Sequence, residues 1–149
     1  MKILLQRVQQ ASVTVDGEVV GSIGRGLLAF VGTTRGDTEA IATRLAERVA
    51  GYRVFPDADG RTNCSVRDVG GSVLVVSQFT LYANTRKGAR PSFTRAGPPD
   101  EAARLVELVR THLEHLGVPT AAGVFGAEMQ VALVNDGPFT ILLEKAPEA

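Results

Sequence analysis

The chain of 149 residues is 44% hydrophobic, and its 16 lysines and arginines balance its 16 aspartates and glutamates. A formal net charge of zero excludes binding to nucleic acid or to an anionic membrane through the global field of the protein, so any such binding needs a local patch. The single cysteine, Cys64, excludes an internal disulfide and is typical of a reducing, cytoplasmic compartment. We expect one domain over residues 1–149, without a signal peptide or a membrane span.

The segment Met1 to Val8 is predicted to form a strand with Ile3, Leu5 and Arg7 on one face. Arg7 is the unusual member of this face, because a half-buried guanidinium needs a carbonyl or carboxylate acceptor. At an edge of the sheet it would instead extend to water. The residues alone leave both alternatives open.

Further strands are predicted before residue 33. Residues 12–20 are typical of a β-hairpin, since Asp16-Gly17 supplies the positive φ angles of a type I′ turn. The run from Leu27 to Gly32 is apolar without interruption, which favours a strand covered on both faces.

A first helix is predicted to follow Asp37, which is expected to cap it, and to end at Gly51. Its apolar residues Ile41, Leu45 and Val49 recur every four positions, while charged residues occupy the opposite side. We expect this helix to cover one face of the sheet.

A short strand is predicted at residues 52–55, followed by a turn at residues 56–60. The two aspartates of this turn, Asp57 and Asp59, lack the further oxygen ligands and the closing glutamate of a calcium loop. A plain turn is therefore favoured over a calcium site.

Residues 70–81 are predicted to form the strand around which the chain is organised. Its middle is apolar and β-branched, and it then continues through Ser77, Gln78, Phe79 and Thr80. On a regular strand the first and third of these residues face one side and the other two face the opposite side. Either the strand ends or kinks near Gln78, or only part of this set carries chemistry. A core strand whose hydroxyls cap backbone groups is the alternative.

The segment 82–97 is predicted to be a long loop with no acidic residue. It contains four cations, Arg86, Lys87, Arg90 and Arg95. A local basic patch beside a polar strand end is suited to phosphate groups, through non-specific and salt-sensitive contacts. The alternatives are a solvated loop without a ligand and a loop that Pro91 and Phe93 hold against the body of the protein.

A second helix is predicted after Pro98, with prolines and acidic residues at its start and Gly117 after its end. His112 and His115 lie three positions apart on this helix. A metal site would need further ligands from elsewhere, so we favour positions at the surface or at the edge of the apolar stripe.

Two strands are predicted at residues 125–134 and 139–143, and Met129 shares a face of the first strand with other apolar side chains. The two strands are expected to pair across the turn Asn135-Asp136-Gly137-Pro138. A proline after Asp-Gly is out of place in a two-residue hairpin turn, and a Gly-Pro bond has appreciable access to the cis form. A plain surface turn is the alternative.

Strands outnumber helices in this prediction, and no repeat or linker interrupts them. We expect a mixed α/β fold in which two layers of β-sheet carry both helices on one side, and not a doubly wound parallel sheet. We expect no metal and no other cofactor.

Two motifs carry a resemblance to a known family. Residues 77–81, Ser-Gln-Phe-Thr-Leu, and residues 135–140, Asn-Asp-Gly-Pro-Phe-Thr, resemble the paired signature of D-aminoacyl-tRNA deacylases, which remove D-amino acids from mischarged tRNA. The resemblance covers nearly the whole chain and departs from the family only in the tail and at surface positions. Shorter similar stretches stand at residues 6–8, 11–13, 70–73, 90–93 and 125–127.

The resemblance implies a cytoplasmic homodimer that binds the aminoacylated end of tRNA and has two active sites at the subunit interface. The catalytic set that it implies is Ser77, Gln78, Phe79 and Thr80. Substrate binding and chiral selection would belong to Gly137, Pro138, Arg7, Asn135 and Met129. In this family the Gly-Pro dipeptide takes the cis form and reaches into the site of the partner, and the arginine helps to hold it.

A Ser-His-Asp relay is not expected from these motifs, and Ser77 or Thr80 alone is a poor nucleophile. We favour hydrolysis assisted by the 2′-hydroxyl of the substrate, with backbone N–H groups near Phe79 and Thr80 holding the oxyanion. Main-chain atoms of Gly137 and Pro138 are expected to exclude L-substrates, so that glycyl-tRNA is also hydrolysed. The rival classes are a non-catalytic RNA-binding dimer and a small-ester hydrolase with a hydroxyl nucleophile.

Overall fold

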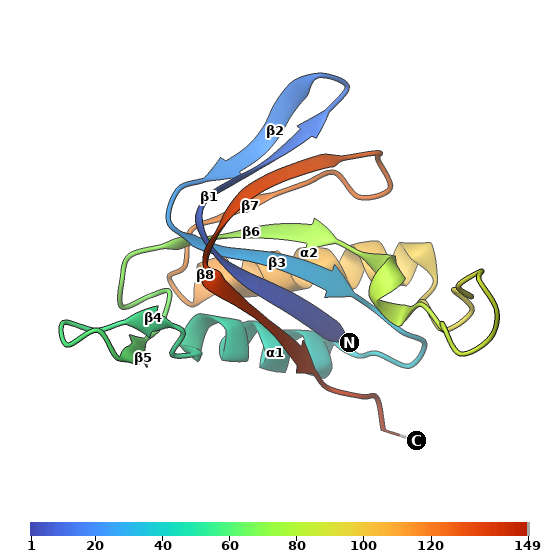
Figure 1. The fold of residues 1–149 in the computed structure, drawn as a ribbon. Helices are drawn as coiled ribbons and strands as arrows, with labels where there is room; N and C mark the ends of the chain where they lie inside the picture. Colours follow the sequence, from blue (N-terminus) through green and yellow to red (C-terminus); the bar gives the residue numbers. More distant parts are fainter. Residues whose placement is uncertain (149) are drawn as a thin grey trace.

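The computed structural model describes residues 1–148, so Ala149, at the end of the tail, lies outside the described part. Figure 1 shows a curved sheet with two helices along one side of it. In chain order the elements are β1 (Lys2–Val15), β2 (Glu18–Ile23), β3 (Gly26–Gly32), α1 (Glu39–Gly51), β4 (Phe55–Pro56), β5 (Thr62–Cys64), β6 (Ser72–Ser77), the 3₁₀ helix η1 (Phe79–Tyr82), α2 (Pro99–His115), β7 (Thr120–Ala122) and β8 (Gln130–Glu144).

The main sheet mixes antiparallel and parallel strands. Its order is β2-β1-β3-β6-β7, and β8 pairs with β1 outside this path. The pairs of β1 with β2, β3 and β8 are antiparallel, whereas β3–β6 and β6–β7 are parallel. Parallel neighbours need crossover connections, and these contain α1 and α2. The mixed α/β fold with both helices on one side is confirmed, and β4 and β5 form a separate small sheet.

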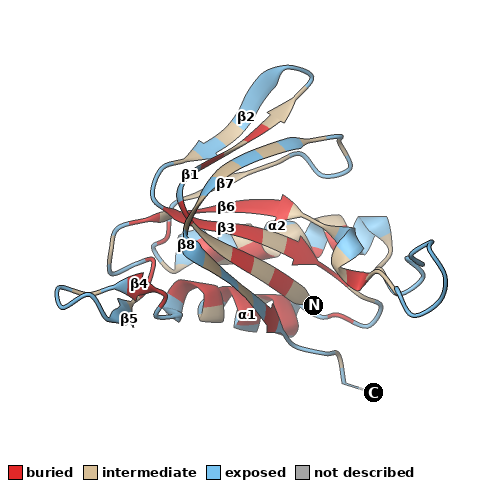
Figure 2. Ribbon diagram, in the orientation of Figure 1, coloured by how far each residue is buried: buried red, intermediate tan, exposed pale blue. Residues whose placement is uncertain are grey.

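Neighbouring residues of the central strands point into two different cores. Leu27 of β3 and Val73 of β6 pack against the helices in the first core, whereas Leu28 and Leu74 lie in a second core on the opposite face of the sheet. Figure 2 shows both strands buried along most of their length. The prediction that residues 27–32 form a strand covered on both faces is therefore confirmed.

The second core is enclosed because the sheet bends. The strands β2 and β7 stand at opposite ends of the sheet order, yet a Cβ atom at Gly21 of β2 would lie 2.5 Å from the carbonyl oxygen of Ala122 in β7. Only glycine allows this approach of the two backbones. The two sheet layers expected from the sequence are thus two parts of one bent sheet.

The start of α1 corrects a prediction. Thr38, and not Asp37, is the N-cap, and its hydroxyl accepts from the N–H of Ile41 at 3.3 Å. Asp37 is buried, and its carboxylate accepts instead from the α-amino group of Met1 and from the N–H of Thr34. A carboxylate used by two interior donors is not available to cap the helix.

The C-terminal hairpin prediction is wrong. Residues 130–144 form one continuous strand, β8, which runs antiparallel to β1 along almost all of it, and residues 125–127 precede it as a turn. Val8 pairs with Asn135 and Gln6 pairs with Thr140, so residues 136–139 form a bulge opposite Arg7. The 14-residue β1 is long enough to provide a partner for both halves of β8.

Two smaller turn predictions are confirmed. Asp16 and Gly17 have φ angles of 51° and 80°, as the hairpin turn between β1 and β2 requires. In the turn 56–60, the Asp57 carboxylate accepts from the N–H groups of Asp59 and Arg61. The strand predicted at residues 52–55 is shorter and lies later, since β4 contains only Phe55 and Pro56.

Candidate functional site

The polar motif 77–80 begins where β6 ends. Ser77 is the last residue of the strand, and Gln78 has φ −145° and ψ 81° while its N–H donates to the carbonyl of Val31 at 2.8 Å. The 3₁₀ helix η1 starts at Phe79. The chain therefore leaves the sheet at Gln78, as one of the two alternatives requires, and consecutive side chains no longer alternate between faces.

A cleft of about 660 Å³ opens at this point. Its lining residues include those at and after the carboxyl ends of β3 and β6, two strands that run side by side in the same direction in Figure 1. This is a common place for ligands in sheets of this kind. Ser77, Gln78 and Phe79, here called the floor, line it together with Met129, whereas Thr80 does not. The remaining lining residues are Val31, Thr33, Arg35, Phe93, Ala96, Gly97, Pro98, Pro99, Ala102, Val106, Phe125, Gly126 and Ala127.

The cleft contains few groups that ionise. Arg35 is the one charged residue of its lining, and the lining includes no histidine, carboxylate, lysine, cysteine or tyrosine. The hydroxyl of Thr80 accepts from Nε2 of Gln78 at 2.5 Å. Within residues 1–148, the N–H groups of Phe79 and Thr80 make no backbone hydrogen bond outside η1. Free backbone donors and neutral polar side chains are therefore the chemical groups at the floor.

Three aromatic side chains line the cleft, and their rings are here called its aromatic mouth: those of Phe79, Phe93 and Phe125. Phe79 is 54% exposed, and its ring meets that of Phe93 edge to face with 5.2 Å between centroids. Phe125 is also exposed and lines the cleft. Phe93 thus packs against Phe79, as one alternative expects of the loop, whereas Pro91, the other residue of that alternative, is exposed.

The loop 84–97, here called the basic loop, separates its four cations. Three of them surround a small hollow of about 330 Å³, which is lined by Asn84, Arg86, Lys87, Arg90 and Ser92. Arg95 lies elsewhere, with its guanidinium 5.7 Å from the ring centroid of Tyr82. Burial raises the pKa of the Tyr82 phenol, so the ring is neutral at physiological pH.

The bulge 136–139 is fixed at its base. Nε of Arg7 donates to the carbonyl of Asp136 at 2.9 Å, Nη1 donates to the carbonyl of Val54 at 2.6 Å, and the guanidinium lies over the Phe139 ring at 4.8 Å. The side-chain amide of Asn135 donates to the carbonyls of Arg7 and Phe139 and accepts from the N–H of Phe139. Of the two alternatives for Arg7, the one in which its guanidinium finds carbonyl or carboxylate acceptors is confirmed.

Gly137 and Pro138 form the exposed tip of this bulge, and the peptide bond between them is cis. Neither residue lines the cleft of its own chain, and neither do Arg7 and Asn135. Ser77 pairs with Val31 of β3, and Val31 pairs with Ile3 of β1, so the floor is level with Ile3 with β3 between them. Ile3 is four residues from Arg7, which is about 13 Å along the strand. One chain therefore does not bring the two motifs together.

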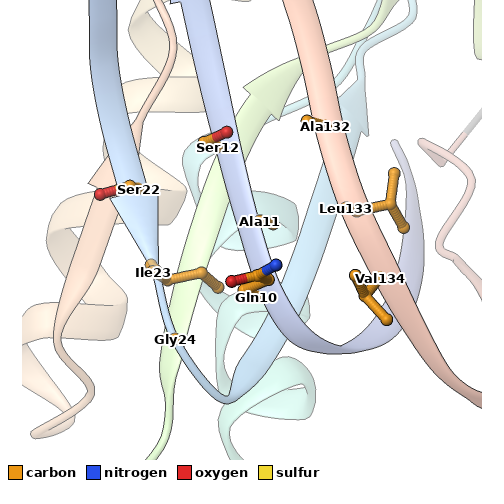
Figure 3. Close-up of a pocket in the computed structure, with 9 residues that line it drawn as sticks. All are labelled: Gln10, Ala11, Ser12, Ser22, Ile23, Gly24, Ala132, Leu133 and Val134. Carbon is orange, nitrogen blue, oxygen red and sulfur yellow. The ribbon is translucent and has the colours of Figure 1, made fainter.

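Other candidate sites are separate from both motifs. Figure 3 shows a second hollow, of about 530 Å³, between β1, β2 and β8, and none of the predicted site residues lines it. The rings of His112 and His115 stack at 5.9 Å, and Nε2 of His112 lies 3.6 Å from a carboxylate oxygen of Glu47. Among residues 1–148 no group of three or more His, Cys, Asp or Glu is placed to hold a metal, and no helix is long and apolar enough to cross a membrane.

The sequence reasoning missed one wall of the cleft. Thr33, Arg35, Ala96 and Gly97 line it, although none of them stood in a recognised motif. Their position follows from topology, because parallel pairing of β3 with β6 places the residues after β3 beside the floor. Predicting that residues 27–32 pair in parallel with residues 70–77 would have identified Thr33 and Arg35.

Comparison with known proteins agrees with the two motifs. The family described as D-Tyr-tRNA(Tyr) deacylase matches residues 4–144. Proteins named D-aminoacyl-tRNA deacylase from Roseiflexus castenholzii and Thermomicrobium roseum are each 60% identical over 98% of this chain, covering 93% and 95% of their own lengths.

Solved structures share the fold. One, of a protein named c-Myc DNA unwinding element binding protein, is 39% identical, with a TM-score of 0.92 over 98% of this chain and 99% of its own. Another, described as a probable eukaryotic D-amino acid tRNA deacylase, has a TM-score of 0.83 at 17% identity, with 95% and 97% covered. With a family match over residues 4–144 and relatives at 60% identity, the chain belongs to the D-Tyr-tRNA(Tyr) deacylase family of hydrolases.

Proposed function

We propose that this protein hydrolyses the ester bond of D-aminoacyl-tRNA, releases the free D-amino acid and tRNA, and so proofreads the chirality of amino acids in the cytoplasm. Membership of the family and the names of the relatives support the reaction. The observation that carries the mechanism is the cleft itself, which has aromatic walls and a polar floor but no acid or base side chain other than Arg35 in its lining.

A site of this kind hydrolyses an ester by orienting it. The aminoacyl ester is already reactive, and the neighbouring 2′-hydroxyl of the ribose activates the attacking water. The N–H groups of Phe79 and Thr80 hold the developing oxyanion, and removing one such donor typically costs about 3–4 kcal/mol of transition-state stabilisation. Gln78 and Ser77 supply neutral polar contacts, and the Thr80 hydroxyl positions the Gln78 amide.

The aromatic mouth is suited to flat groups of the substrate. Exposed rings such as Phe79 and Phe125 provide stacking surfaces for a base or for an aromatic D-side chain. Met129 lines the same cleft with a flexible apolar side chain that adapts to different shapes. Side-chain identity therefore contributes little to selection.

Chirality is selected by the bulge of a second chain. We propose a homodimer in which Gly137 and Pro138 of one subunit enter the cleft of the other and occupy the space that an L side chain needs. Arg7 and Asn135 fix the bulge for this role. Two observations support the assembly: the bulge is exposed and distant from its own cleft, and within residues 1–148 β8 pairs only with β1, so that its second edge is open for another chain.

Glycyl-tRNA follows as a second substrate of the same site. Glycine has no side chain to meet Gly137 and Pro138, so exclusion by shape does not reject it. The expected order of turnover is D-aminoacyl-tRNA and glycyl-tRNA well above L-aminoacyl-tRNA.

The basic loop is proposed to bind tRNA phosphates. Arg86, Lys87 and Arg90 surround one hollow and are exposed, which suits a phosphate group. Arg95 is proposed as a fourth contact, at the place where the loop returns to Tyr82. Such contacts position the acceptor end without reading its sequence.

A second candidate function is nucleic-acid binding without catalysis. The basic loop favours it, and so does the name of one structural relative, a DNA unwinding element binding protein. A test that separates the candidates is incubation with D-tyrosyl-tRNA, L-tyrosyl-tRNA and a free D-tyrosine ester. Turnover of D-tyrosyl-tRNA alone supports the proposal, no turnover favours the binding function, and turnover of all three indicates a general esterase.

A further inference from the structure

The N-terminus is buried inside the protein and not free at its surface. The side chain of Met1 has no exposed area, and its α-amino group donates to Oδ1 of Asp37 and to the carbonyl of Lys145, each at 2.8 Å. The N–H of Lys145 donates back to the carbonyl of Met1 at 3.0 Å. Both side chains of the Met1–Asp37 ion pair are 0% exposed. The first residue is thus enclosed on all sides by the chain.

The same carboxylate holds the segment after β3. Oδ2 of Asp37 accepts from the N–H of Thr34 at 2.8 Å, while the N–H of Asp37 donates to the carbonyl of Thr34 at 3.2 Å. Asp37 therefore joins the N-terminal ammonium directly to the turn at residues 33–37.

That turn holds the end of the basic loop. The hydroxyl of Thr34 donates to the carbonyl of Arg95 at 2.5 Å, Thr34 pairs with Ala96 in an isolated antiparallel bridge, and the N–H of Gly97 donates to the carbonyl of Thr33 at 2.9 Å. Thr33, Ala96 and Gly97 line the cleft. A continuous series of hydrogen bonds thus leads from the α-amino group to one wall of the candidate active site.

An acyl group or a preceding residue on Met1 breaks this series at its origin. Formylation, acetylation or a peptide bond removes the positive charge and leaves a single N–H where the ammonium has three. It also adds atoms at a position with no exposed area. The Asp37 carboxylate then stays buried without its counter-ion, which is strongly unfavourable, so the turn must move to rehydrate it.

The interior of the protein is an unfavourable place for the Met1 ammonium. Burial lowers the pKa of the Met1 ammonium in spite of its hydrogen bond to Asp37, which means that the folded state disfavours the charge it holds.

We propose that the free α-amino group of Met1 is a positioning group for the candidate active site, and that an acylated or extended N-terminus displaces the cleft wall formed by Thr33, Ala96 and Gly97. Deacylation then depends on N-terminal processing of the chain. This rests on the proposed function for its effect on activity, but not for its effect on the cleft.

The test compares the protein that begins at Met1 with one that carries two glycines before Met1. The same two residues added after Ala149 give the matched control. Hydrogen exchange is followed at the amides of Thr34 and Gly97, which report on the turn and the wall, and at Val73, whose N–H donates to Pro119 in the core. Deacylation of D-tyrosyl-tRNA is measured on the same samples.

The N-terminal extension is expected to speed exchange at Thr34 and Gly97 by roughly 10-fold or more with Val73 unchanged, and to lower kcat/KM by roughly 10- to 100-fold, because small displacements of positioned groups have effects of this size. Asp37→Asn should reproduce the local exchange, and adding the extension to it should cause little further change, since both act on one contact. Asp57→Asn is the matched control, because the Asp57 carboxylate also accepts from two N–H groups but lies in an exposed turn. It should change neither the exchange rates nor kcat/KM.

Unchanged exchange at Thr34 and Gly97 in the extended protein would overturn the inference, and so would equal acceleration at Val73, which indicates general destabilisation. Unchanged kcat/KM despite local opening would overturn its catalytic part. If the native protein shows no deacylation at all, the proposed function fails, while the exchange data still decide whether the α-amino group holds the wall.

Discussion

The floor of the cleft and the bulge of β8 carry the two motifs of the sequence in opposite surroundings. The floor follows a strand buried on both faces, and loops, a helix and aromatic rings enclose it. The bulge interrupts an edge strand, with Gly137 and Pro138 exposed at its tip. Hydrogen bonds from Arg7 and Asn135 nevertheless hold its base in one conformation.

This difference suggests a division between substrate binding and chiral selection. In our account the floor, which one chain forms by itself, binds and orients the substrate. We expect a bulge that is held at its base and exposed at its tip to act against another surface. In our account that surface is the cleft of a second subunit, so binding comes from one chain and chiral selection from the other.

The largest expected effect is on selectivity, from Arg7→Ala. Loss of the guanidinium removes charge-assisted hydrogen bonds to the carbonyls of Asp136 and Val54, each worth about 1.5–3 kcal/mol, and frees the bulge. The ratio of D-tyrosyl- to L-tyrosyl-tRNA hydrolysis should fall by roughly 10- to 100-fold, mainly because L-turnover rises. Single-turnover deacylation of both substrates measures it.

Arg44→Ala is the matched control, since Arg44 is exposed on α1 and its guanidinium pairs with Glu47 there. Its D-to-L ratio should equal that of the parent protein. If the D-to-L ratio of Arg7→Ala also equals that of the parent protein, the bulge does not select chirality.

The next effect concerns affinity and leaves selectivity unchanged. Replacing Arg86, Lys87 and Arg90 by alanine removes the cations around one hollow of the basic loop. KM for D-tyrosyl-tRNA should rise by roughly 10-fold, and the slope of log KM against log salt should fall by about one for each phosphate that is no longer bound. Arg61→Ala in the β4–β5 turn serves as control. A changed D-to-L ratio with an unchanged salt slope would contradict the assignment.

A smaller effect is expected from Thr80→Ala and Thr80→Val. The Thr80 hydroxyl accepts from the Gln78 amide and does not line the cleft, so its loss should lower the single-turnover rate by less than about 10-fold, the worth of one neutral hydrogen bond. Mass spectrometry of the quenched parent reaction should find no acyl-threonyl species. Complete loss of activity, with such a species trapped, would establish covalent catalysis in place of substrate assistance.

The smallest effect is on the stability of the protein and concerns an ion pair on α2. Arg110 donates hydrogen bonds to Glu107 on α2 and lowers the pKa of that carboxyl. A lowered folded-state pKa means that the contribution is present above the ordinary glutamate pKa near 4.5 and is lost as pH falls through the lowered value. The Glu107 side chain is 57% exposed and that of Arg110 is 25% exposed, so water screens the pair, and Arg110→Ala should cost less than about 1 kcal/mol at pH 7. Urea unfolding of both proteins at neutral and acidic pH checks this, and a larger loss at acidic pH would contradict it.

The sequence predicts the elements of the floor better than those of the bulge. Apolar runs and apolar periodicity identify β3, β6 and both helices, because burial dictates the residues at those positions. The role of Asp37 is missed because its partner is the α-amino group of Met1, 36 positions away, which no local pattern reveals. The hairpin predicted across residues 135–138 fails for a similar reason, since only the length and curvature of β1 make β8 one strand.

The candidate site shows the same limit. Ser77, Gln78 and Phe79 could be found as a polar end to an apolar strand, and Arg7 as an arginine on an apolar face. Their distance from Gly137 and Pro138 depends on how β1 pairs with β3 and β8, which is a property of the whole sheet. Thr33 and Gly97 join the cleft through topology alone.

The most direct test of the shared site mixes two variants in one dimer. The Arg7→Ala chain has a normal cleft and a displaced bulge. The Ala127→Trp chain has a normal bulge, but its cleft is filled by the tryptophan and should be inactive on both substrates. Ala127→Trp is added in large excess, and mixed dimers are verified by mass tags. In a mixed dimer the cleft of the Arg7→Ala chain receives the normal bulge of the Ala127→Trp chain only if the site is shared between subunits. The account predicts that L-tyrosyl-tRNA hydrolysis by the Arg7→Ala chains falls by roughly 10-fold or more while D-turnover persists. Unchanged L-hydrolysis in verified mixed dimers, or a chain that stays monomeric while rejecting L-substrates, would contradict it.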